Sequence, residues 1–438
     1  MDHLLAVAEK FAHQGRVVGV REYGSGNVND TFLVTLDSKR EKHFILQRLN
    51  PQVFRRPELV MGNLCTVSDH VRQRLEHTPL SPGRRWEVPR VLLTQDGQDH
   101  FIDSEGSFWR ALSFIEAAQT FDIIKDLEHA REVGQALGMF HNLLCDLPPE
   151  RLADTLPGFH ITPRYLSHYD EVLAKHGEGQ SPEESPEKRL WERGPGADCH
   201  LQSLSQTLSP NPHIGGWEGS LRGRRGIAGR DACATGPPAL PSKTIFQSSP
   251  EVDYALQFVS QRRGWAPVLE EAKAQGRLRL KPIHGDPKVN NFMMDIATGQ
   301  AVSLVDLDTV KPGLVHYDIG DCLRSACNPL GEETERWETV RFEPELGRAI
   351  LQGYLLLARD FLTADDYEYL YDAIRVIAFE LGLRFFTDYL EGNVYFKAKH
   401  PEHNLVRALV QFKLTESIES QERALRAIIR DETSQGGG

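Results

Sequence analysis

Two short polar segments in the second half of the chain constrain its fold and chemistry more than any other feature. The first reads His284-Gly285-Asp286-Pro287-Lys288-Val289-Asn290-Asn291, and the second reads Val305-Asp306-Leu307-Asp308. Asn291 stands five residues after Asp286, and Asp306 stands fifteen residues after Asn291. The apolar run 301–305 predicts a buried strand. That strand would deliver the Asp306 carboxylate to the edge of a ladder.

This order of groups is typical of phosphoryl transfer. In protein kinases, an Asp receives the acceptor's proton, an Asn five residues later holds Mg²⁺, and a further Asp completes the metal site. Asp286 is therefore the candidate base, and Asn291 and Asp306 are candidate Mg²⁺ ligands, because magnesium prefers oxygen donors. Lys288 is positioned to touch the transferring phosphate, which makes it a second catalytic candidate. Any one of these residues alone would most often belong to an ordinary turn, but the ordered set is hard to obtain by chance.

Composition narrows the possible partners. The 438 residues carry a net charge of −12, which leaves no basic footprint for nucleic acid or an anionic membrane. No stretch approaches the roughly eighteen apolar residues of a membrane span, and residues 1–10 lack the pattern of a signal peptide. The six cysteines form no C-x-x-C pair, which indicates reduced thiols without a zinc site or disulfide framework. We therefore expect a cytoplasmic enzyme that binds neither nucleic acid nor a membrane.

The first part of the chain is predicted to be a small β-rich lobe. Five segments have the composition of strands, namely 16–23, 30–36, 43–49, 90–94 and 109–115. A helical rhythm over 58–75 adds a packing helix. This order predicts a five-stranded antiparallel sheet with one helix packed against it.

The nucleotide would bind to this lobe. A glycine turn between the first two strands lets backbone N–H groups approach phosphates, which nominates Gly24, Gly26 and Asn29. The third strand ends without the lysine that kinases place there, so Arg48, or Gln47 after a one-residue shift, would substitute. A solvated arginine is as good an interpretation of Arg48. Phe114 and Ile115, in the hinge after the fifth strand, would hold the adenine.

The rest of the chain is predicted to be mainly helical. Apolar periodicity marks helices near 124–144, 363–381 and 405–412, the second with a capping-box start. Asp318 and Asp321 would orient the 284–291 loop or cap the helix that begins nearby. Arg384 and Tyr395, in a segment dense in aromatic groups, are the candidate acceptor contacts. Aromatic side chains at helical spacing are, however, more often core.

These elements predict an α+β protein with a bilobal, protein-kinase-like fold. The nucleotide-binding lobe would comprise residues 1–113, and the helical lobe, with the catalytic and acceptor sites, residues 114–433. Residues 177–250 are rich in Gly, Pro and Ser and lack periodicity, so we expect a disordered insertion in the second lobe.

The pattern H-G-D-x-K-x-N-N, with V-D-L-D-T and D-I-G-D after it, resembles the aminoglycoside phosphotransferase and choline kinase family. Within this family the likeness is closest to N-acetylhexosamine 1-kinases. It depends on segments 23–29, 45–50, 305–309, 388–396 and 401–407, and it extends from about residue 4 to about residue 430 except for the insertion. The resemblance implies an ATP- and Mg²⁺-dependent kinase that phosphorylates the anomeric hydroxyl of N-acetylglucosamine or N-acetylgalactosamine. Carried over by motif, Asp286 is the base, Asn291 and Asp306 bind the metal, and Arg384 and Tyr395 contact the sugar.

Two alternatives remain open. A kinase of the same fold could act on another small alcohol or amine, such as an amino alcohol or an aminoglycoside. The missing third-strand lysine also leaves room for a non-catalytic, kinase-like binding protein. The intact set of Asp286, Asn291 and Asp306 argues against that second alternative.

Overall fold

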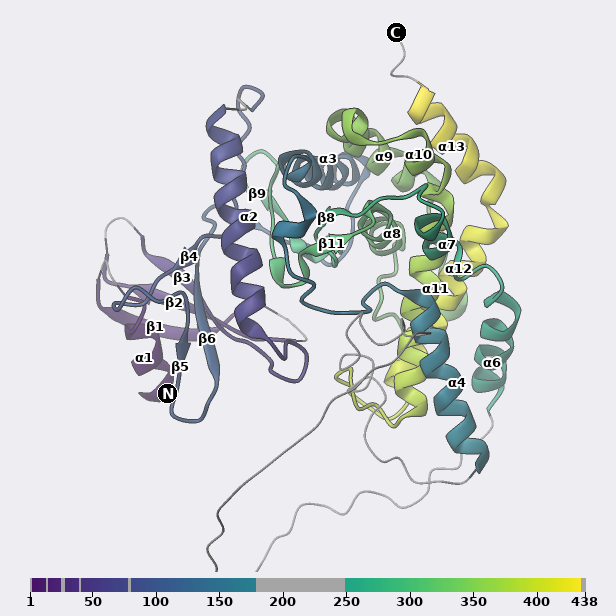
Figure 1. The fold of residues 1–438 in the computed structure, drawn as a ribbon, viewed down its shortest axis with the longest axis horizontal. Coiled ribbons are helices and arrows are strands. Elements are labelled where there is room, and N and C mark those ends of the chain that lie inside the picture. The colour runs from purple at the N-terminus through teal and green to yellow at the C-terminus, as the bar shows by residue number, and fades with distance from the viewer. Residues whose placement is uncertain are drawn as a thin grey trace, which may run out of the picture.

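The computed structural model describes residues 2–12, 15–24, 28–38, 41–77, 80–178 and 249–434. These residues form an N-terminal antiparallel sheet and a larger, mainly helical C-terminal part (Figure 1). The predicted α+β class is therefore confirmed. The insertion expected at 177–250 falls almost entirely outside the described residues. Helix α4 (Thr162–Glu178) precedes this gap and helix α6 (Pro250–Arg262) follows it.

The N-terminal sheet has six strands, whereas the sequence predicted five. Its path runs β1-β2-β3-β6-β4, and β5 pairs with β6. The strands are β1 (Val17–Glu22), β2 (Asp30–Leu36), β3 (His43–Arg48), β4 (Val91–Leu92), β5 (Phe101–Ile102) and β6 (Phe108–Ser113). The missed strand β5 is two residues long, too short to show an alternating pattern.

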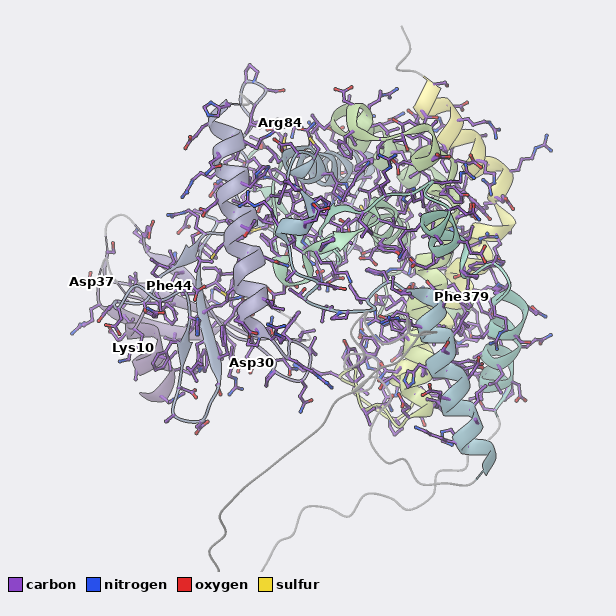
Figure 2. The ribbon with its side chains drawn as sticks, in the orientation of Figure 1. Lys10, Asp30, Asp37, Phe44, Arg84 and Phe379 are labelled. Atoms are coloured by element: carbon purple, nitrogen blue, oxygen red, sulfur yellow. The ribbon has the colours of Figure 1, made fainter. Side chains whose placement is uncertain are left out.

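Helices cover both faces of this sheet. Helix α1 (Asp2–Glu9) contributes Val7 to a core that also contains Phe44, Leu46 and Trp109 (Figure 2 labels Phe44). Helix α2 (Pro57–His77), the predicted packing helix, buries Val60, Leu64 and Val67 in the large core that continues into the C-terminal part. Figure 1 shows α2 between the sheet and the helical part. The two faces of the sheet therefore have different partners: one packs on α1, and the other faces the rest of the molecule.

The C-terminal part carries three groups of elements. Its α-helices besides α4 and α6 are α3 (Leu127–Leu144), α7 (Val268–Ala274), α8 (Val315–Ala326), α9 (Pro344–Ala358), α10 (Ala364–Glu368), α11 (Leu370–Leu390), α12 (His403–Ser420) and α13 (Glu422–Ser434). Its 3-10 turns are η1 (Pro149–Arg151), η2 (Val289–Asn291), η3 (Leu307–Thr309), η4 (Trp337–Thr339) and η5 (Arg359–Phe361). Its short strands are β7 (Ala118–Gln119), β8 (Lys281–Ile283), β9 (Phe292–Asp295), β10 (Ala301–Leu304) and β11 (Lys311–Gly313).

Helix packing fixes the frame on which the short strands sit. Helices α3 and α9 approach so closely that a Cβ on Gly134 would overlap the backbone of Ile350, and one on Gly353 would overlap the backbone of Arg131. Phe379 of α11 (Figure 2) lies in a second core with Phe258 of α6 and Phe412 of α12. The capping box predicted at the start of the 363–381 helix is present at α10.

Two antiparallel pairs hold the polar segments. Strands β9 and β10 pair with Leu304 opposite Phe292, and β7 adds to the outer edge of β9. Strands β8 and β11 pair with Lys311 opposite Ile283. The loop 284–288 leaves the end of β8 and enters η2 and β9, and Asp306 follows the end of β10. The two segments singled out in the sequence therefore both connect the β8–β11 pair to the β9–β10 hairpin, and they meet at the same end of that hairpin.

Candidate active site

Asp286 and Lys288 form an ion pair in the loop between β8 and η2. Lys288 Nζ donates to Asp286 Oδ2 at 2.6 Å, and Asn291 Nδ2 donates to the Asp286 main-chain oxygen at 2.7 Å. The Asp286 side chain is 28% exposed, and its Oδ1 has no hydrogen-bond partner among the described residues. Desolvation lowers the pKa of Lys288, but the charges of the Asp286 and Asp306 carboxylates raise it by more than desolvation lowers it. The pKa of Lys288 therefore lies above the ordinary value. Lys288 is therefore a cation placed between two carboxylates.

Asp306 reaches the same place from the other strand of the β9–β10 hairpin. The Val305 N–H donates to the main-chain oxygen of Asn291 at 2.9 Å, which ties the end of β10 to the end of η2. Asp306 itself adopts a left-handed conformation, φ 67° and ψ 55°, so the chain turns sharply there. Asp306 has an exposed surface, yet the protein atoms around its carboxylate partly desolvate it, and this desolvation, with the charges of Asp308 and Asp286, raises its pKa to about 6 against the opposing charge of Lys288. The three residues predicted to act together thus share one electrostatic neighbourhood.

The donor set fits a magnesium ion. Within the described chain, neither Asn291 Oδ1 nor the Asp306 carboxylate has a hydrogen-bond or ion-pair partner, although Asn291 is buried. No group of three or more His, Cys, Asp or Glu side chains in that part of the chain is arranged to hold a metal. Magnesium is usually held by one or two protein oxygens together with waters and substrate phosphates. Asn291 and Asp306 offer such a pair.

Asp318 anchors the loop that carries the base. Its two oxygens accept from His284 N at 2.6 Å and from Gly285 N at 2.8 Å, and His141 Nε2 lies 2.9 Å from Oδ2. Burial raises the pKa of Asp318, but His141 and these contacts outweigh it and hold the pKa below its ordinary value. The interpretation of Asp318 as a cap is wrong, because α8 begins at Val315 with Leu314 as its N-cap. The alternative that it orients the loop agrees with these bonds.

Asp321, one turn further along α8, has a different partner. Its Oδ1 accepts from Arg324 Nε at 2.8 Å, whereas its buried Oδ2 has no hydrogen-bond partner among the described residues. Burial, together with the charge of Asp286, raises the pKa of Asp321 although Arg324 opposes the shift. Like Asp318, it lies inside α8 and does not cap it. An unpaired carboxylate oxygen near the candidate base is suited to accept a hydrogen bond from a ligand.

A buried arginine that the sequence analysis overlooked joins the N-terminal sheet to Asp308. Arg110 of β6 pairs with Asp308 through Nη2, and Gln47 Oε1 accepts from the same guanidinium at 2.7 and 3.0 Å. Asn29 Nδ2 donates to the other oxygen of Asp308 at 2.6 Å. The side chains of Arg110 and Asp308 are 1% and 3% exposed. No sequence signal marks Arg110, since it lies inside an apolar strand and its partner is 198 residues away.

The structure does not bring Arg48 to this group. Gln47 pairs across the ladder with Arg110, and Arg48 with Trp109, so the two neighbours point to opposite faces of the sheet. Arg48 lies on the α1 face, where it pairs with Asp30 at 2.6 Å and is 45% exposed. The one-residue shift considered from the sequence therefore points to the correct face, although the cation there is Arg110.

The other nucleotide candidates lie near the hinge or in the first turn. Ile115 is buried against Met293 and Val302, with Val305 beside them, so the hinge packs directly on the β9–β10 hairpin. Phe114 makes edge contacts with Tyr23 and His43. Gly24 has φ 79°, as expected of a glycine turn. Gly26 falls outside the described residues.

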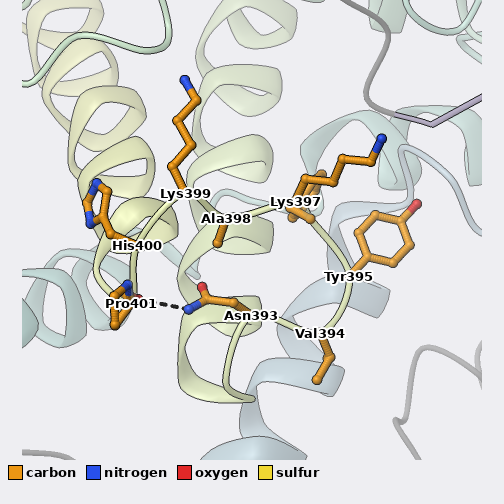
Figure 3. Close-up of a pocket in the computed structure, with 9 residues that line it drawn as sticks. Asn393, Val394, Tyr395, Lys397, Ala398, Lys399, His400 and Pro401 are labelled. Carbon is orange, nitrogen blue, oxygen red and sulfur yellow. Dashed lines mark hydrogen bonds between the residues drawn. The ribbon is translucent and has the colours of Figure 1, made fainter. Parts of the chain in front are cut away.

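The two acceptor candidates come together. The Arg384 guanidinium of α11 lies 6.0 Å from the ring of Tyr395 and between 5.1 and 5.3 Å from three more aromatic rings, those of Phe159, Tyr165 and Phe396. Figure 3 shows the loop 393–401, which carries Tyr395 and lines a pocket of about 410 Å³. Asp388 holds this loop by accepting from Tyr395 N at 2.7 Å and Phe396 N at 3.1 Å. We call this cluster of Arg384 and its four rings the acceptor wall.

A comparison with protein families agrees with this geometry. The profile of the phosphotransferase enzyme family matches residues 19–364, most of the chain. The chain therefore belongs to that family, and it is a phosphotransferase of the small-molecule kinase type.

Solved structures of similar fold come from the same group of enzymes. Choline kinase from Cryptosporidium parvum has a TM-score of 0.53 at 11% identity, with 99% of each chain covered. A microcompartment-associated aminopropanol kinase has a TM-score of 0.51 at 13% identity, with 96% of this chain and 98% of that chain covered. A spectinomycin phosphotransferase, solved with ADP and spectinomycin, has a TM-score of 0.47 at 10% identity, with 96% and 98% covered. At such identities the likeness shows the fold alone.

In the described ranges, no helix is both long enough and apolar enough to cross a bilayer.

Proposed function

We propose that this protein transfers the terminal phosphoryl group of ATP to the anomeric hydroxyl of an N-acetylhexosamine, N-acetylglucosamine or N-acetylgalactosamine, and releases the sugar 1-phosphate and ADP. The observation that carries the proposal is the convergence of Asp286, Lys288, Asn291 and Asp306, which lie on the two connections between the β8–β11 pair and the β9–β10 hairpin. The family supports phosphoryl transfer, and the choice of sugar depends on the acceptor wall and on the resemblance of the motifs.

The roles of the residues follow from their partners. Asp286 Oδ1, which has no partner among the described residues, accepts the proton of the acceptor hydroxyl. As it does so, the hydroxyl oxygen attacks the terminal phosphorus of ATP, and the bond between that phosphorus and the ADP oxygen breaks. Lys288 is a cation beside that position and neutralises charge on the transferring group. Mg²⁺, held by Asn291 and Asp306, would supply the remaining neutralisation of the phosphates. An anomeric hydroxyl is more acidic than an ordinary alcohol, so a carboxylate base suffices.

Arg110 supplies the buried cation that the third strand lacks. It lies on the strand next to Gln47, faces the active site and lowers the pKa of Asp306 through its charge. We propose that it replaces the usual lysine as the cation of the N-terminal sheet. Arg48, on the opposite face, is not placed for this role.

The acceptor wall favours a neutral acceptor. An aromatic cluster of this kind can bind a quaternary or primary ammonium group, but here Arg384 already occupies the space between the rings. A second cation there would meet like charge. An acetamido sugar instead offers hydrogen-bonding groups to Arg384 and an apolar face to the rings.

One observation favours the second candidate, a kinase for an amino alcohol or aminoglycoside. Asp321 has an unpaired, buried carboxylate oxygen near Asp286, and an ammonium group is a good partner for such an oxygen. A hydroxyl group of a sugar would satisfy the same oxygen. The two candidates therefore differ in which chemical groups of the acceptor Arg384 and Asp321 would bind.

Acceptor-dependent ADP release decides between them. We would incubate the full-length protein with ATP and Mg²⁺ and a panel of N-acetylhexosamines, hexoses, choline, ethanolamine, aminopropanol and aminoglycosides, with Asp286→Asn as the blank. The proposal expects release with an N-acetylhexosamine and a product whose ³¹P signal is that of an anomeric phosphate. Release only with amines would select the second candidate, and ATP·Mg²⁺ binding without release for any acceptor would indicate a non-catalytic protein.

A further inference from the structure

His160 is a buried residue that no motif predicted and that touches the base-carrying loop. It lies in the turn before α4 with φ 65° and is 4% exposed. Its Nδ1 lies 2.9 Å from Glu380 Oε1 of α11, and its Nε2 lies 2.7 Å from the main-chain oxygen of Gly285. The ring is sandwiched by Phe159 at 4.0 Å and Tyr317 at 5.3 Å between ring centroids.

The partners of the two ring nitrogens decide the protonation state. A main-chain oxygen and a carboxylate can only accept, whereas a neutral imidazole has a single N–H to donate. The other oxygen of Glu380 accepts from Thr162 Oγ1 at 2.6 Å, so the geometry of this side chain is that of an acceptor at both oxygens. With acceptors at both ring nitrogens, we infer that His160 carries a hydrogen on each nitrogen and is an imidazolium paired with the Glu380 carboxylate.

The surrounding charges agree with this assignment. Burial lowers the pKa of His160, but the charge and hydrogen bond of Glu380, the Gly285 oxygen and the charge of Asp321 raise it above the ordinary value. The opposing cation is Lys311 of β11, whose ammonium lies 3.4 Å from the Phe159 main-chain oxygen and also pairs with Asp154. Tyr317 of α8 is neutral, because burial and Glu270 raise its pKa well above the usual range.

The contact with Gly285 completes a two-sided hold on that residue. Asp318 accepts from the Gly285 N–H at 2.8 Å, and His160 donates to the Gly285 oxygen at 2.7 Å. Gly285 has φ 89°, a conformation that glycine enters and leaves easily. Without His160, the peptide group between Gly285 and Asp286 would keep only the bond from the Asp286 N–H to His284 Nδ1, at 3.2 Å, so its carbonyl, and with it the direction of the Asp286 side chain, would be held less firmly.

The same turn also belongs to the acceptor wall. Phe159, the neighbour of His160, lies 5.1 Å from the Arg384 guanidinium. Glu380 precedes Arg384 by one helical turn on α11, so the two face the same side. One turn of chain and one helix thus connect the acceptor wall to the base.

We propose that His160 is a charged positioning residue, whose imidazolium clamps the Gly285 carbonyl to Glu380 and thereby fixes Asp286 relative to the acceptor wall. The clamp rests on the proposed function for its catalytic consequence. The charge of His160 is independent of it. Because an imidazolium exists only below its own pKa, which Glu380 raises above the ordinary value, the clamp holds below that pKa and opens as the pH rises through it.

The charge is tested by NMR on the full-length protein labelled with ¹⁵N in histidine and glycine, without any substrate. We expect both ring nitrogens of His160, assigned by comparison with His160→Gln, to be protonated at neutral pH. The Gly285 amide signal should shift as the ring titrates. In Glu380→Gln both changes should move to lower pH, because the raising charge is lost. A neutral His160 ring at neutral pH, or an unchanged titration in Glu380→Gln, would overturn the clamp.

The catalytic consequence is tested with whichever acceptor the panel identifies. We expect His160→Gln to lower kcat by about 10²-fold, the usual cost of a base displaced by about 1 Å, with KM for ATP nearly unchanged. The alkaline limb of the kcat profile should move to lower pH in Glu380→Gln. His70→Gln, which removes the histidine of a pair with Asp146, two residues past the end of α3, is the matched control and should leave kcat unchanged. Equal effects of His70→Gln and His160→Gln would reduce the clamp to a structural contact. Failure to find any acceptor would count against the proposed function and leave the NMR result standing.

Discussion

At the scale of single residues, the proposed chemistry depends on one carboxylate that is held in place but not neutralised. Asp286 shares one oxygen with Lys288 and leaves the other without a partner among the described residues. Its loop is fixed by Asp318 on one side and His160 on the other. Such a base is oriented before the acceptor arrives, which lowers the entropic part of the barrier.

We expect Asp286→Asn to abolish the base while preserving the shape of the loop. The amide cannot accept the acceptor's proton, so kcat should fall by about 10²–10⁴-fold, the usual contribution of general-base catalysis. Binding of ATP, measured by calorimetry, should stay nearly intact because Asn291 and Asp306 are untouched. Full turnover in this variant would reject the base assignment.

A glycine beside the base gives a second residue-scale prediction. In Gly285→Ala the new Cβ would stand 2.7 Å from the Thr309 oxygen, in addition to the strain of φ 89°. Gly299→Ala is the control, since Gly299 has φ 72° but nothing within 4 Å of the added Cβ. Both variants should lose about 1–3 kcal/mol of unfolding free energy in denaturant titrations. Only Gly285→Ala should also lose kcat, and similar kcat values for the two would contradict the close fit of the loop.

At the scale of elements, the site is supported by helices that touch without side chains between them. The α3–α9 contact brings His141 of α3 next to Tyr354 of α9 and under Asp318, at 2.9 Å in each case. A change in the distance between these two helices would therefore be transmitted through these two hydrogen bonds to Asp318, which holds the loop of the candidate base. Close approach needs glycine at the crossing, which explains Gly134 and Gly353.

We expect Gly353→Ala to push α9 away from α3. The added Cβ would overlap the Arg131 main-chain oxygen and the Gln135 nitrogen, so the unfolding free energy should fall by about 1–3 kcal/mol, as in other overpacked cores. Leu356→Ala on the same helix is the control, because Leu356 is 67% exposed and its loss should change little. Thermal and denaturant unfolding of the two variants measure the difference. Equal stabilities would show that the helices can separate without cost.

At the scale of the whole molecule, the N-terminal sheet meets the C-terminal part at Asp308. Arg110 approaches this carboxylate from β6 and Asn29 from the residue just before β2, and Asp308 follows the metal candidate Asp306 by two residues. The orientation of one part of the protein is thereby coupled to the geometry of a metal ligand. A buried ion pair of this kind is a means of specifying geometry and is weak evidence for stability by itself.

We expect the Arg110–Asp308 pair to show strong coupling. Arg110→Met or Asp308→Leu alone leaves an unpaired buried charge and should lower the unfolding free energy by about 3–5 kcal/mol. The double variant removes both charges and should recover most of that loss. Denaturant titrations of the four proteins in the cycle give the coupling energy directly. Additive losses would mean that the two side chains do not interact in solution.

The sequence was a good guide to local structure. The strands of the N-terminal sheet, the helix α2 and the Thr363–Asp366 capping box all depend on residues close together along the chain. The roles assigned to Asp286, Asn291 and Asp306 stay predictions, yet their proximity also follows from local order, since one hairpin pairing brings the two segments together. The prediction failed for strand β5 and for the capping role of Asp318, where the local signal was too short or ambiguous.

What the sequence by itself determined is the set of candidate groups for the reaction and the elements that bear them, because backbone conformation and hydrophobic periodicity depend on a few neighbouring residues. Only the tertiary structure decided their partners. Arg110 and Asp308 are 198 residues apart, and His160 and Glu380 are 220 apart, so neither pair leaves a mark in any short window. Such contacts exist because burial of the cores brings distant elements together, and an unpaired buried charge would cost too much to leave there.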